Sequence, residues 1–272
     1  MMSRAKLLLG TCVTIQVQTT PDDSAAASAI DGAFETIAHI DRVMSAHRPD
    51  SDLGRMSRAA PELVLQLDAH TVTVLKASHY WWQVSGGAFN PVMAARTLAR
   101  QGHRPGLNPS TLLDCEFSLL TFLSDTQVKM PGPVCIDLGG IAKGYAVDQA
   151  IQVLSKHGIR DAMVNAGGDI RVLGTKGFRV DICHAQEQLR DRPFKRLKRL
   201  QSAALATSVA DTHQTAFVRT LKARREAWRN STVLAPDCMT ADALTKWALQ
   251  SSRLCPQLKA AMRLHSASMW RS

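Results

Sequence analysis

The residues best suited to chemistry lie close together, where Asp137, Gly139, Gly140 and Lys143 separate an apolar run from an amphipathic segment. The first amides of a helix have no partner within it and carry the positive end of its dipole, so glycines there leave bare N–H groups that a phosphate can approach. A lysine adds a point charge. The spacing matches neither the P-loop nor the dinucleotide-binding fingerprint. The residues alone therefore favour two interpretations equally: an anion site, or a tight strand-to-helix turn with an exposed lysine.

The neighbouring elements must hold this stretch in place. The apolar run at 133–137 predicts a strand that leads into it. A helix follows, because four apolar residues recur at the spacing of one helical face: Val147, Ala150, Ile151 and Leu154. Beyond the helix, Gly-Gly-Asp at 167–169 lies between two apolar runs and predicts a hairpin over 162–174, with a third strand at 178–182.

Helices and strands are interspersed along the rest of the chain. Strands or extended segments are expected at 7–18, 63–67, 116–122, 127–130, 202–208 and 230–236, and helices at 21–47, 69–84 and 239–250. Asp68 is a plausible N-cap for the helix at 69–84. Because the hairpin argues against a purely parallel sheet, the sequence predicts an α+β fold: one domain over 1–272, with a mixed or antiparallel sheet and flanking helices.

The net charge of +10 is concentrated in one region. Between Arg190 and Arg229 there are eleven lysines or arginines and three acids, which leaves a local net charge of +8. Such a segment could attract nucleic acid, an anionic membrane surface or a phosphorylated ligand. A solvated basic face is the more common explanation, and Phe194, Phe217 and Trp228 are the only aromatic residues interleaved with the charges.

Cysteine usage and hydropathy bear on the compartment. Six cysteines are scattered singly without a C-x-x-C pair, which favours thiols in a reducing compartment over a zinc site. No window approaches the 18 apolar residues of a spanning helix, and the first residues show neither a signal-peptide cleavage site nor a lipobox. We therefore expect a cytoplasmic protein without a transmembrane segment; the periplasm is the alternative.

Two blocks, IDLGGIAKGYAVDQA at 136–150 and VNAGGDIRVLG at 164–174, together resemble the core signature of the ApbE family, the FAD:protein FMN transferases. Weaker pieces follow the order of that family: LLLGTCVTIQV, DRVMSAHRPDSDLGRM, GGAFNPV, ALATS and VLAPDCMTADAL. The resemblance covers most of the chain. It implies an ApbE-like fold and a Mg²⁺-dependent reaction in which a threonine hydroxyl of an acceptor protein attacks the FMN phosphorus of FAD and AMP leaves. A metal and a helix terminus are suited to neutralising the oxygen charge of such a phosphoryl transfer.

The resemblance also implies the residues of the site. It matches Asp137 and Lys143 to contacts with the flavin nucleotide, and Ala88, Phe89 and Asn90 to a loop that contacts the cofactor. For the metal it implies the Gly140 carbonyl, Asp242 and Thr245. Each has a structural alternative, such as a helix N-terminal acid for Asp242, a turn residue for Asn90 and a core residue for Phe89.

Three features depart from the family pattern. The family usually has threonine four residues after the metal-binding aspartate, whereas this chain has Thr245 at three and Lys246 at four. A histidine-bearing H-I-I-D-P-like segment is expected within 209–232, where this chain has only His213 and no such motif. Asn90 stands where the family commonly has aspartate. The catalytic residue therefore stays unassigned.

Three functional hypotheses remain. The first is the flavin transfer, and the second is a flavin-nucleotide-binding protein that has lost transfer and serves as an FAD hydrolase, scaffold or regulator. The third, a nucleic-acid site on the basic segment 190–229, ranks last because the segment carries no recognised binding motif.

Overall fold

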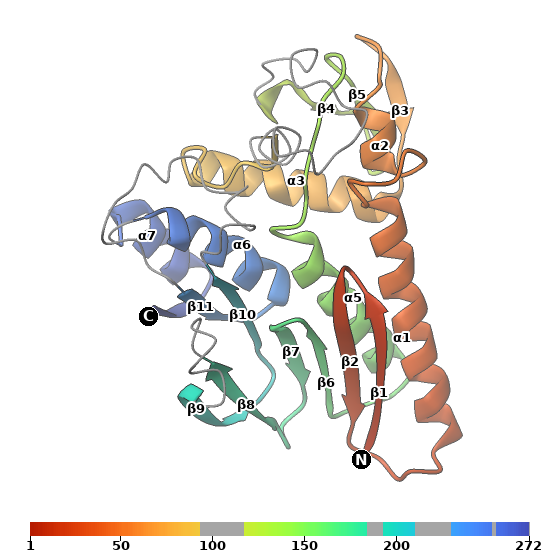
Figure 1. Ribbon diagram of the computed structural model, residues 1–272, viewed down its shortest axis with the longest axis vertical. Coiled ribbons are helices and arrows are strands. Elements are labelled where there is room, and N and C mark those ends of the chain that lie inside the picture. Colours follow the sequence, from red (N-terminus) through yellow and green to blue (C-terminus); the bar gives the residue numbers. More distant parts are fainter. Residues whose placement is uncertain (93–116, 184–192, 210–229, 252–253, 272) are drawn as a thin grey trace. The chain divides into compact units, whose positions relative to one another are not determined.

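The computed structural model describes residues 1–92, 117–183, 193–209, 230–251 and 254–271 (Figure 1). Its described parts form two compact units. The first unit takes in residues 1–39 and the described parts of 143–210 and 225–272, and the second takes in the described parts of 40–142. The prediction of one domain over 1–272 stays a prediction.

The first unit is built on a seven-stranded sheet. Its strands follow the order β1-β2-β6-β7-β10-β11-β12, and every neighbouring pair is antiparallel. The bounds are β1 Met2–Leu8, β2 Thr11–Val17, β6 Ala162–Ala166, β7 Asp169–Leu173, β10 Ala204–Val209, β11 Asn230–Ala235 and β12 Ser268–Arg271. The antiparallel sheet with its flanking helices confirms the predicted α+β fold class.

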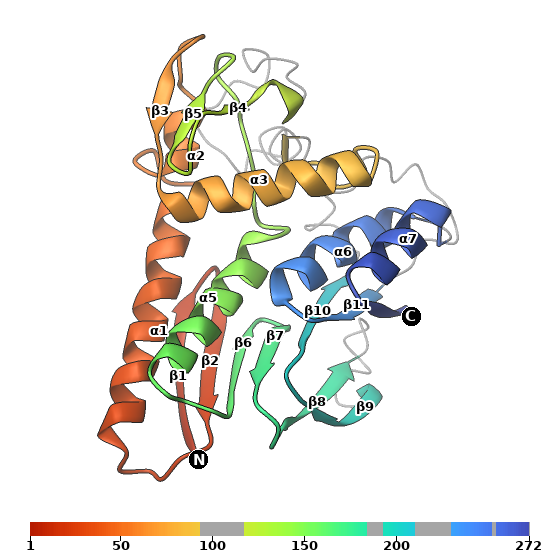
Figure 2. The same ribbon diagram turned by 180° about the vertical axis from the view of Figure 1, so that it is seen from behind.

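Helices cover one face of this sheet. They are α1 (Ser24–Val43), α5 (Ala142–Lys156), α6 (Cys238–Gln250) and α7 (Pro256–Leu264). Helices α5 and α6 lie behind the strands in Figure 1 and in front of them in Figure 2. The predicted apolar stripe of α5 is buried, since Val147, Ala150, Ile151 and Leu154 are at most 4% exposed. The sequence therefore predicted correctly which side of this helix packs inward.

Strand alternation sets what lies under α5. In β6, Ala162, Val164 and Ala166 are fully buried, and the register places Val164 opposite Arg171 and Ala166 opposite Asp169 of β7. Because side chains alternate across a strand, Asp169 and Arg171 share the helix-covered face, and Ile170 and Val172 point to the other. Two charged residues thereby lie on a largely apolar surface.

The opposite face of β7 packs on a second, two-stranded sheet. Its strands are β8 (Phe178–Cys183) and β9 (Pro193–Leu200), paired antiparallel. The cluster between the sheets contains Ile170, Val172, Phe178, Val180, Ile182, Leu200 and Leu205. The expected strand at 178–182 is thus confirmed, but it pairs with β9 and does not extend the hairpin.

The described part of the second unit contains a three-stranded sheet of order β3-β5-β4, together with α2 and α3. The bounds are α2 Asp52–Met56, β3 Val64–Gln66, α3 Ala69–Val84, β4 Thr121–Phe122 and β5 Gln127–Lys129, with a 3₁₀ turn at Phe117–Leu119. Asp68 caps α3 as expected, accepting a hydrogen bond from the His70 N–H at 2.8 Å. Thus both the start and the end of the predicted helix at 69–84 are confirmed.

Two strand expectations need correction. The stretch 7–18 is not one strand, because Leu9 and Gly10 both have positive φ and turn the chain between β1 and β2. Such a pair of residues forms the tight turn that suits a hairpin. The run 133–137 forms no strand; its Val134 and Asp137 N–H groups donate instead to the carbonyls of Met56 and Pro91. The apolar residues of this run are buried, but the run is not hydrogen-bonded to a neighbouring strand.

Among the described residues, no helix is both long and apolar enough to cross a membrane.

Candidate functional site

The segment from Asp137 to Lys143 forms a turn that starts α5. The Asp137 carboxylate accepts a hydrogen bond from the Gly139 N–H at 2.7 Å, and the Ile141 and Ala142 N–H groups both donate to the Leu138 carbonyl. Three of the amides that could have faced a phosphate are therefore used inside the turn. The prediction of an anion site here depends on the remaining amides and on Lys143.

In the second unit, the turn lies next to the loop that the resemblance matched to the cofactor. The Asp137 N–H donates to the Pro91 carbonyl at 3.1 Å, one residue beyond Asn90. The loop itself is held to the end of α3, where the Phe89 N–H donates to the Ser85 hydroxyl at 2.9 Å. Phe89 is 1% exposed, so its side chain serves as a core residue. The structure thus brings Asp137 together with the segment 88–91.

In the first unit, Lys143 forms an ion pair with Asp169. The ammonium comes from the first turn of α5, and the carboxylate follows the turn at Gly167 and Gly168, both of which have positive φ. Burial alone would lower the pKa of Lys143, but the charges of Asp169 and Asp242 outweigh it and raise the pKa above its ordinary value. Burial and the charge of Asp242 raise the pKa of Asp169, and Lys143 counters them. The pair keeps a charged lysine at the start of the helix.

Asp242 on α6 is the second carboxylate of this region and is fully buried. Its Oδ2 accepts a hydrogen bond from the Gly144 N–H at 3.3 Å. Its Oδ1 makes no hydrogen bond with any residue that the structure describes, and the Lys246 ammonium lies 3.3 Å away. A cation therefore already stands beside the one carboxylate oxygen that lacks a hydrogen bond.

Gly144 is required by the close approach of α5 to α6. A Cβ at this position would lie 2.4 Å from the Cys238 carbonyl oxygen, far inside van der Waals contact. The absence of a side chain lets the Gly144 backbone reach Asp242. Helix packing is therefore sufficient to explain why a glycine follows Lys143, and Gly144 needs no role in binding phosphate.

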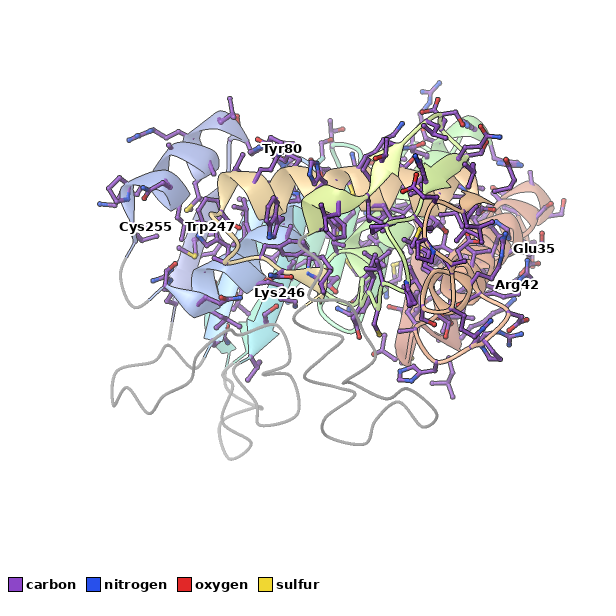
Figure 3. All side chains as sticks on the ribbon, turned by 90° about the horizontal axis from the view of Figure 1, so that it is seen from above. Glu35, Arg42, Tyr80, Lys246, Trp247 and Cys255 are labelled. Atoms are coloured by element: carbon purple, nitrogen blue, oxygen red, sulfur yellow. The ribbon has the colours of Figure 1, made fainter. Side chains whose placement is uncertain are left out.

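Thr245 and Ser208 continue the network around Asp242. Thr245 is fully buried, and its hydroxyl donates to the Asp242 backbone carbonyl at 2.7 Å. Ser208 of β10 lies 2.6 Å from the Thr245 hydroxyl and also accepts a hydrogen bond from the Lys246 ammonium. Figure 3 shows Lys246 next to Trp247 on α6, with the two side chains leaving the helix in different directions. The hydroxyl of Thr245 is thus held by protein groups on both sides.

Asp148 fixes the start of α6 against α5. Its two carboxylate oxygens accept hydrogen bonds from the Cys238 and Met239 N–H groups, each at 2.9 Å, and Arg171 of β7 donates to it at 2.6 Å. Burial raises the pKa of Asp148, while Arg171 and the two amides counter that rise. This contact sets the position of the helix that carries Asp242.

The structure separates the predicted site residues between its two units. Ala88, Phe89, Asn90, Asp137 and Gly140 belong to the second unit, and Lys143, Asp242 and Thr245 to the first. Sequence reasoning missed Asp169 and Ser208 as partners of the two lysines. Asp169 follows a Gly-Gly turn and could have been noticed as a helix-facing acid, whereas no sequence signal indicated Ser208.

Several expectations concern metal, thiols and the basic segment. Within the described ranges, no three His, Cys, Asp or Glu side chains are grouped as a metal site. Among the described residues, Cys12, Cys135, Cys238 and Cys255 form no disulfide, and burial raises the pKa of the Cys238 thiol well above its ordinary value. His213 and most of 190–229 lie outside the described residues.

The fold is that of an α+β protein. In its first unit, two lysine–carboxylate pairs, Lys143 with Asp169 and Lys246 with Asp242, lie where the start of α5 contacts α6. Comparison with known families identifies the family: the sequence model of the ApbE family matches residues 9–253, and the chain belongs to that family. The family resemblance inferred from the sequence is therefore confirmed.

The chain is similar to curated proteins named FAD:protein FMN transferase. It is 29% identical to the one from Treponema pallidum over 64% of this chain and 52% of the relative, and 29% identical to the one from Vibrio cholerae over 48% and 42%. A shorter match to the Rhodobacter capsulatus protein is 48% identical over 58 residues, which are 21% of this chain and 11% of that relative. The chain thus matches about half, or less, of the length of these relatives.

Solved structures share the fold. The flavin transferase ApbE from Vibrio cholerae has a TM-score of 0.76 at 22% identity, over 99% of this chain and 92% of the other. The ApbE protein from Thermotoga maritima has a TM-score of 0.78 at 22% identity, over 99% and 93%. These likenesses confirm the predicted ApbE-like architecture.

Proposed function

We propose that the protein transfers FMN from FAD to a threonine hydroxyl of an acceptor protein and releases AMP. The observation that carries the proposal is the start of α5, where Lys143 in the first helical turn is paired with Asp169 from the hairpin turn. The names of the curated relatives and membership of the ApbE family support the same chemistry.

In the proposed step, the threonine oxygen forms a bond to the FMN phosphorus of FAD. The pyrophosphate P–O bond breaks, AMP leaves with the bridging oxygen, and the threonine proton passes to solution. The chain's own contribution is to hold the pyrophosphate next to fixed positive charge, which stabilises the transition state of phosphoryl transfer. The ion pair keeps Lys143 protonated at neutral pH.

The residues proposed to contact FAD are Asp137 and Lys143, with Ala88, Phe89 and Asn90 in the loop before Pro91. The hydrogen bond from the Asp137 N–H to the Pro91 carbonyl supports a joint role for the turn and the loop, because it fixes the two segments against each other. Asp137 also caps the turn through Gly139, so it shapes the backbone that leads into α5.

Magnesium enters the proposal through the family resemblance, which assigned it to Gly140, Asp242 and Thr245. The buried Oδ1 of Asp242 accepts no hydrogen bond from the described part of the chain and could serve as a ligand for a cation. Yet the Lys246 ammonium lies 3.3 Å from that oxygen, and the Thr245 hydroxyl is engaged by Ser208 and the Asp242 carbonyl. With the Lys246 ammonium in this position, the Asp242 carboxylate does not fit an additional divalent ion, and no step is assigned to one.

The cytoplasm is part of this proposal as the place of reaction. The scattered single cysteines of the sequence, without a C-x-x-C pair, support it, because disulfides are rare in reducing compartments.

A mass-spectrometric assay tests the transfer. The purified full-length protein is incubated with FAD and a pool of threonine-containing peptides, and a matched pool carries valine in place of threonine. We expect an FMN-sized mass gain on the threonine pool alone, with AMP released in equal amount. Lys143→Met should abolish both products, while Lys76→Met, which removes a lysine from an exposed ion pair with Asp125, should leave them unchanged.

The second hypothesis makes a different prediction in the same assay. FAD cleaved to free FMN and AMP, with no adduct on either peptide pool, would show that water is the acceptor and that the protein is a hydrolase. Tight FAD binding without AMP release would identify a scaffold or regulator. Either result would contradict the proposed transfer.

A further inference from the structure

Lys246 and Asp242 stand at positions that bring their side chains together on α6. Residues four apart lie on the same face of a helix, and an acid that precedes a lysine at this spacing is the favourable order. The separation of 3.3 Å between Lys246 Nζ and Asp242 Oδ1 agrees with that expectation. The ion pair is therefore a direct consequence of the sequence Asp-x-x-x-Lys in a helix.

Burial makes this ion pair unusual. The Asp242 side chain is fully buried and that of Lys246 is only 10% exposed. Lysine is rarely buried without a partner, because the loss of hydration disfavours its charge. The partners here are Asp242 and the hydroxyl of Ser208 from β10. The ammonium is thus held by two elements of the first unit.

The hydroxyl groups form a chain with one consistent direction. The Lys246 ammonium donates to Ser208, Ser208 can donate to Thr245, and Thr245 donates to the Asp242 backbone carbonyl. Each hydroxyl then both donates and accepts, and one lone pair on its oxygen is left over. The chain ties Thr245 to Ser208 and Asp242, and the Lys246 ammonium stands at its end.

Charge balance points the same way. The described cluster holds two carboxylates, Asp169 and Asp242, and two lysines, Lys143 and Lys246, paired one to one. The cluster is therefore neutral as it stands. Adding a divalent ion would leave two uncompensated positive charges in a mostly buried region, which is unfavourable.

We propose that the Lys246 ammonium takes the place of a divalent cation beside Asp242, so that the protein binds no Mg²⁺ or Mn²⁺ at this carboxylate. The consequence for FAD rests on the proposed function: a fixed charge supplied by the chain replaces a diffusible ion, and the reaction does not require a divalent ion at Asp242. Lys143 does not share this role, because its ammonium is paired with Asp169.

Manganese binding to the full-length protein tests the proposal without an acceptor. The loss of the free Mn²⁺ signal in electron paramagnetic resonance is measured for wild type, Lys246→Thr and Lys246→Arg, with and without FAD, and FAD alone is the blank. We expect no saturable site in wild type or Lys246→Arg. Lys246→Thr should gain one, which Asp242→Asn in the same chain removes.

Thermal unfolding gives a second readout on the same variants. Saturating Mg²⁺ should leave the wild-type melting temperature unchanged and should raise that of Lys246→Thr by about 5–10 °C, as expected for a ligand at about 100 times its dissociation constant. Lys76→Thr, which removes a lysine from an exposed ion pair, should behave as wild type.

Two results would overturn the proposal. One is a saturable Mn²⁺ site in wild type that Asp242→Asn abolishes, since the ion and the lysine would then coexist. The other is a Lys246→Thr protein that binds no more Mn²⁺ than wild type with FAD present, since the lysine would then not be what excludes the ion. Neither result depends on FMN transfer, so failure of the proposed function is seen separately, as absence of the peptide adduct.

Discussion

Replacing Asp148 with alanine should weaken the packing of α6 against α5. The Asp148 carboxylate accepts hydrogen bonds from the Cys238 and Met239 N–H groups at the start of α6 and from Arg171 in β7. Asp148 is 5% exposed, so its loss leaves a partly buried arginine and two helix-end amides without their acceptor. Removing one partner of a buried charge pair costs about 3–5 kcal/mol. In a chain of this size that corresponds to a fall in melting temperature of roughly 6–20 °C.

The assay is thermal and urea-induced unfolding followed by circular dichroism, with Asp125→Ala as the matched control. Asp125 also pairs with a lysine, Lys76, but its side chain is 94% exposed, so its removal should not change the melting temperature measurably. Asp148→Asn should fall between wild type and Asp148→Ala, because an amide oxygen can still accept from one of the amides. If Asp148→Ala unfolds at the same temperature as Asp125→Ala, the proposed anchoring of α6 is wrong.

Two further predictions concern the helices of the first unit. Gly144→Ala should destabilise the protein by about 1–3 kcal/mol, because its Cβ would lie 2.4 Å from the Cys238 carbonyl oxygen. Urea unfolding measures this loss of stability. The control is Gly32→Ala, whose Cβ would make an ordinary contact at 3.6 Å and which should be neutral or stabilising. Equal stability of the two variants would refute the close approach. Hydrogen bonds from the Thr19 hydroxyl and the Ala26 N–H lower the pKa of Asp23 below its ordinary value of 3.8. The stabilising contribution of Asp23 is therefore complete above pH 3.8 and is lost as the pH falls through the lowered pKa. Asp23→Asn should accordingly flatten the acid limb of a plot of melting temperature against pH. An unchanged acid limb would contradict this.

Local signals in the sequence predicted the elements whose determinants are local. The N-cap at Asp68, the buried stripe of α5 and the hairpin at Gly167 and Gly168 each depend on residues within a few positions. The segment 133–137 was wrongly predicted as a strand: its apolar residues are buried, but its backbone donates to the carbonyls of Met56 and Pro91 and not to a neighbouring strand. The elements α2, α7, β9 and β12 were missed, since α2 has five residues and the others carry short or weak patterns.

In the candidate site too, contacts between residues close in sequence could be predicted, and contacts between distant residues could not. The pairing of Asp242 with Lys246 follows from a spacing of four in one helix and could be read from the sequence. The pairing of Lys143 with Asp169 joins residues 26 positions apart, and it depends on which helix covers β7. Alternation shows that Asp169 and Arg171 share a face, but it does not show which residues lie above them.

In the cluster of Asp169, Asp242, Lys143 and Lys246, the charges balance, so a substitution of one residue affects what its partner needs. Each buried carboxylate has one lysine, and loss of either member leaves a charge without compensation in a region of low exposure. A threonine at 246 would leave the Asp242 carboxylate with the Gly144 N–H as its only hydrogen-bond partner among the described residues, so a bound cation would become favourable. With lysine at 246, the same carboxylate is compensated by the chain itself, and a bound ion would add positive charge to a neutral cluster. The identity of this one residue therefore determines whether the carboxylate on α6 attracts a metal ion or excludes it.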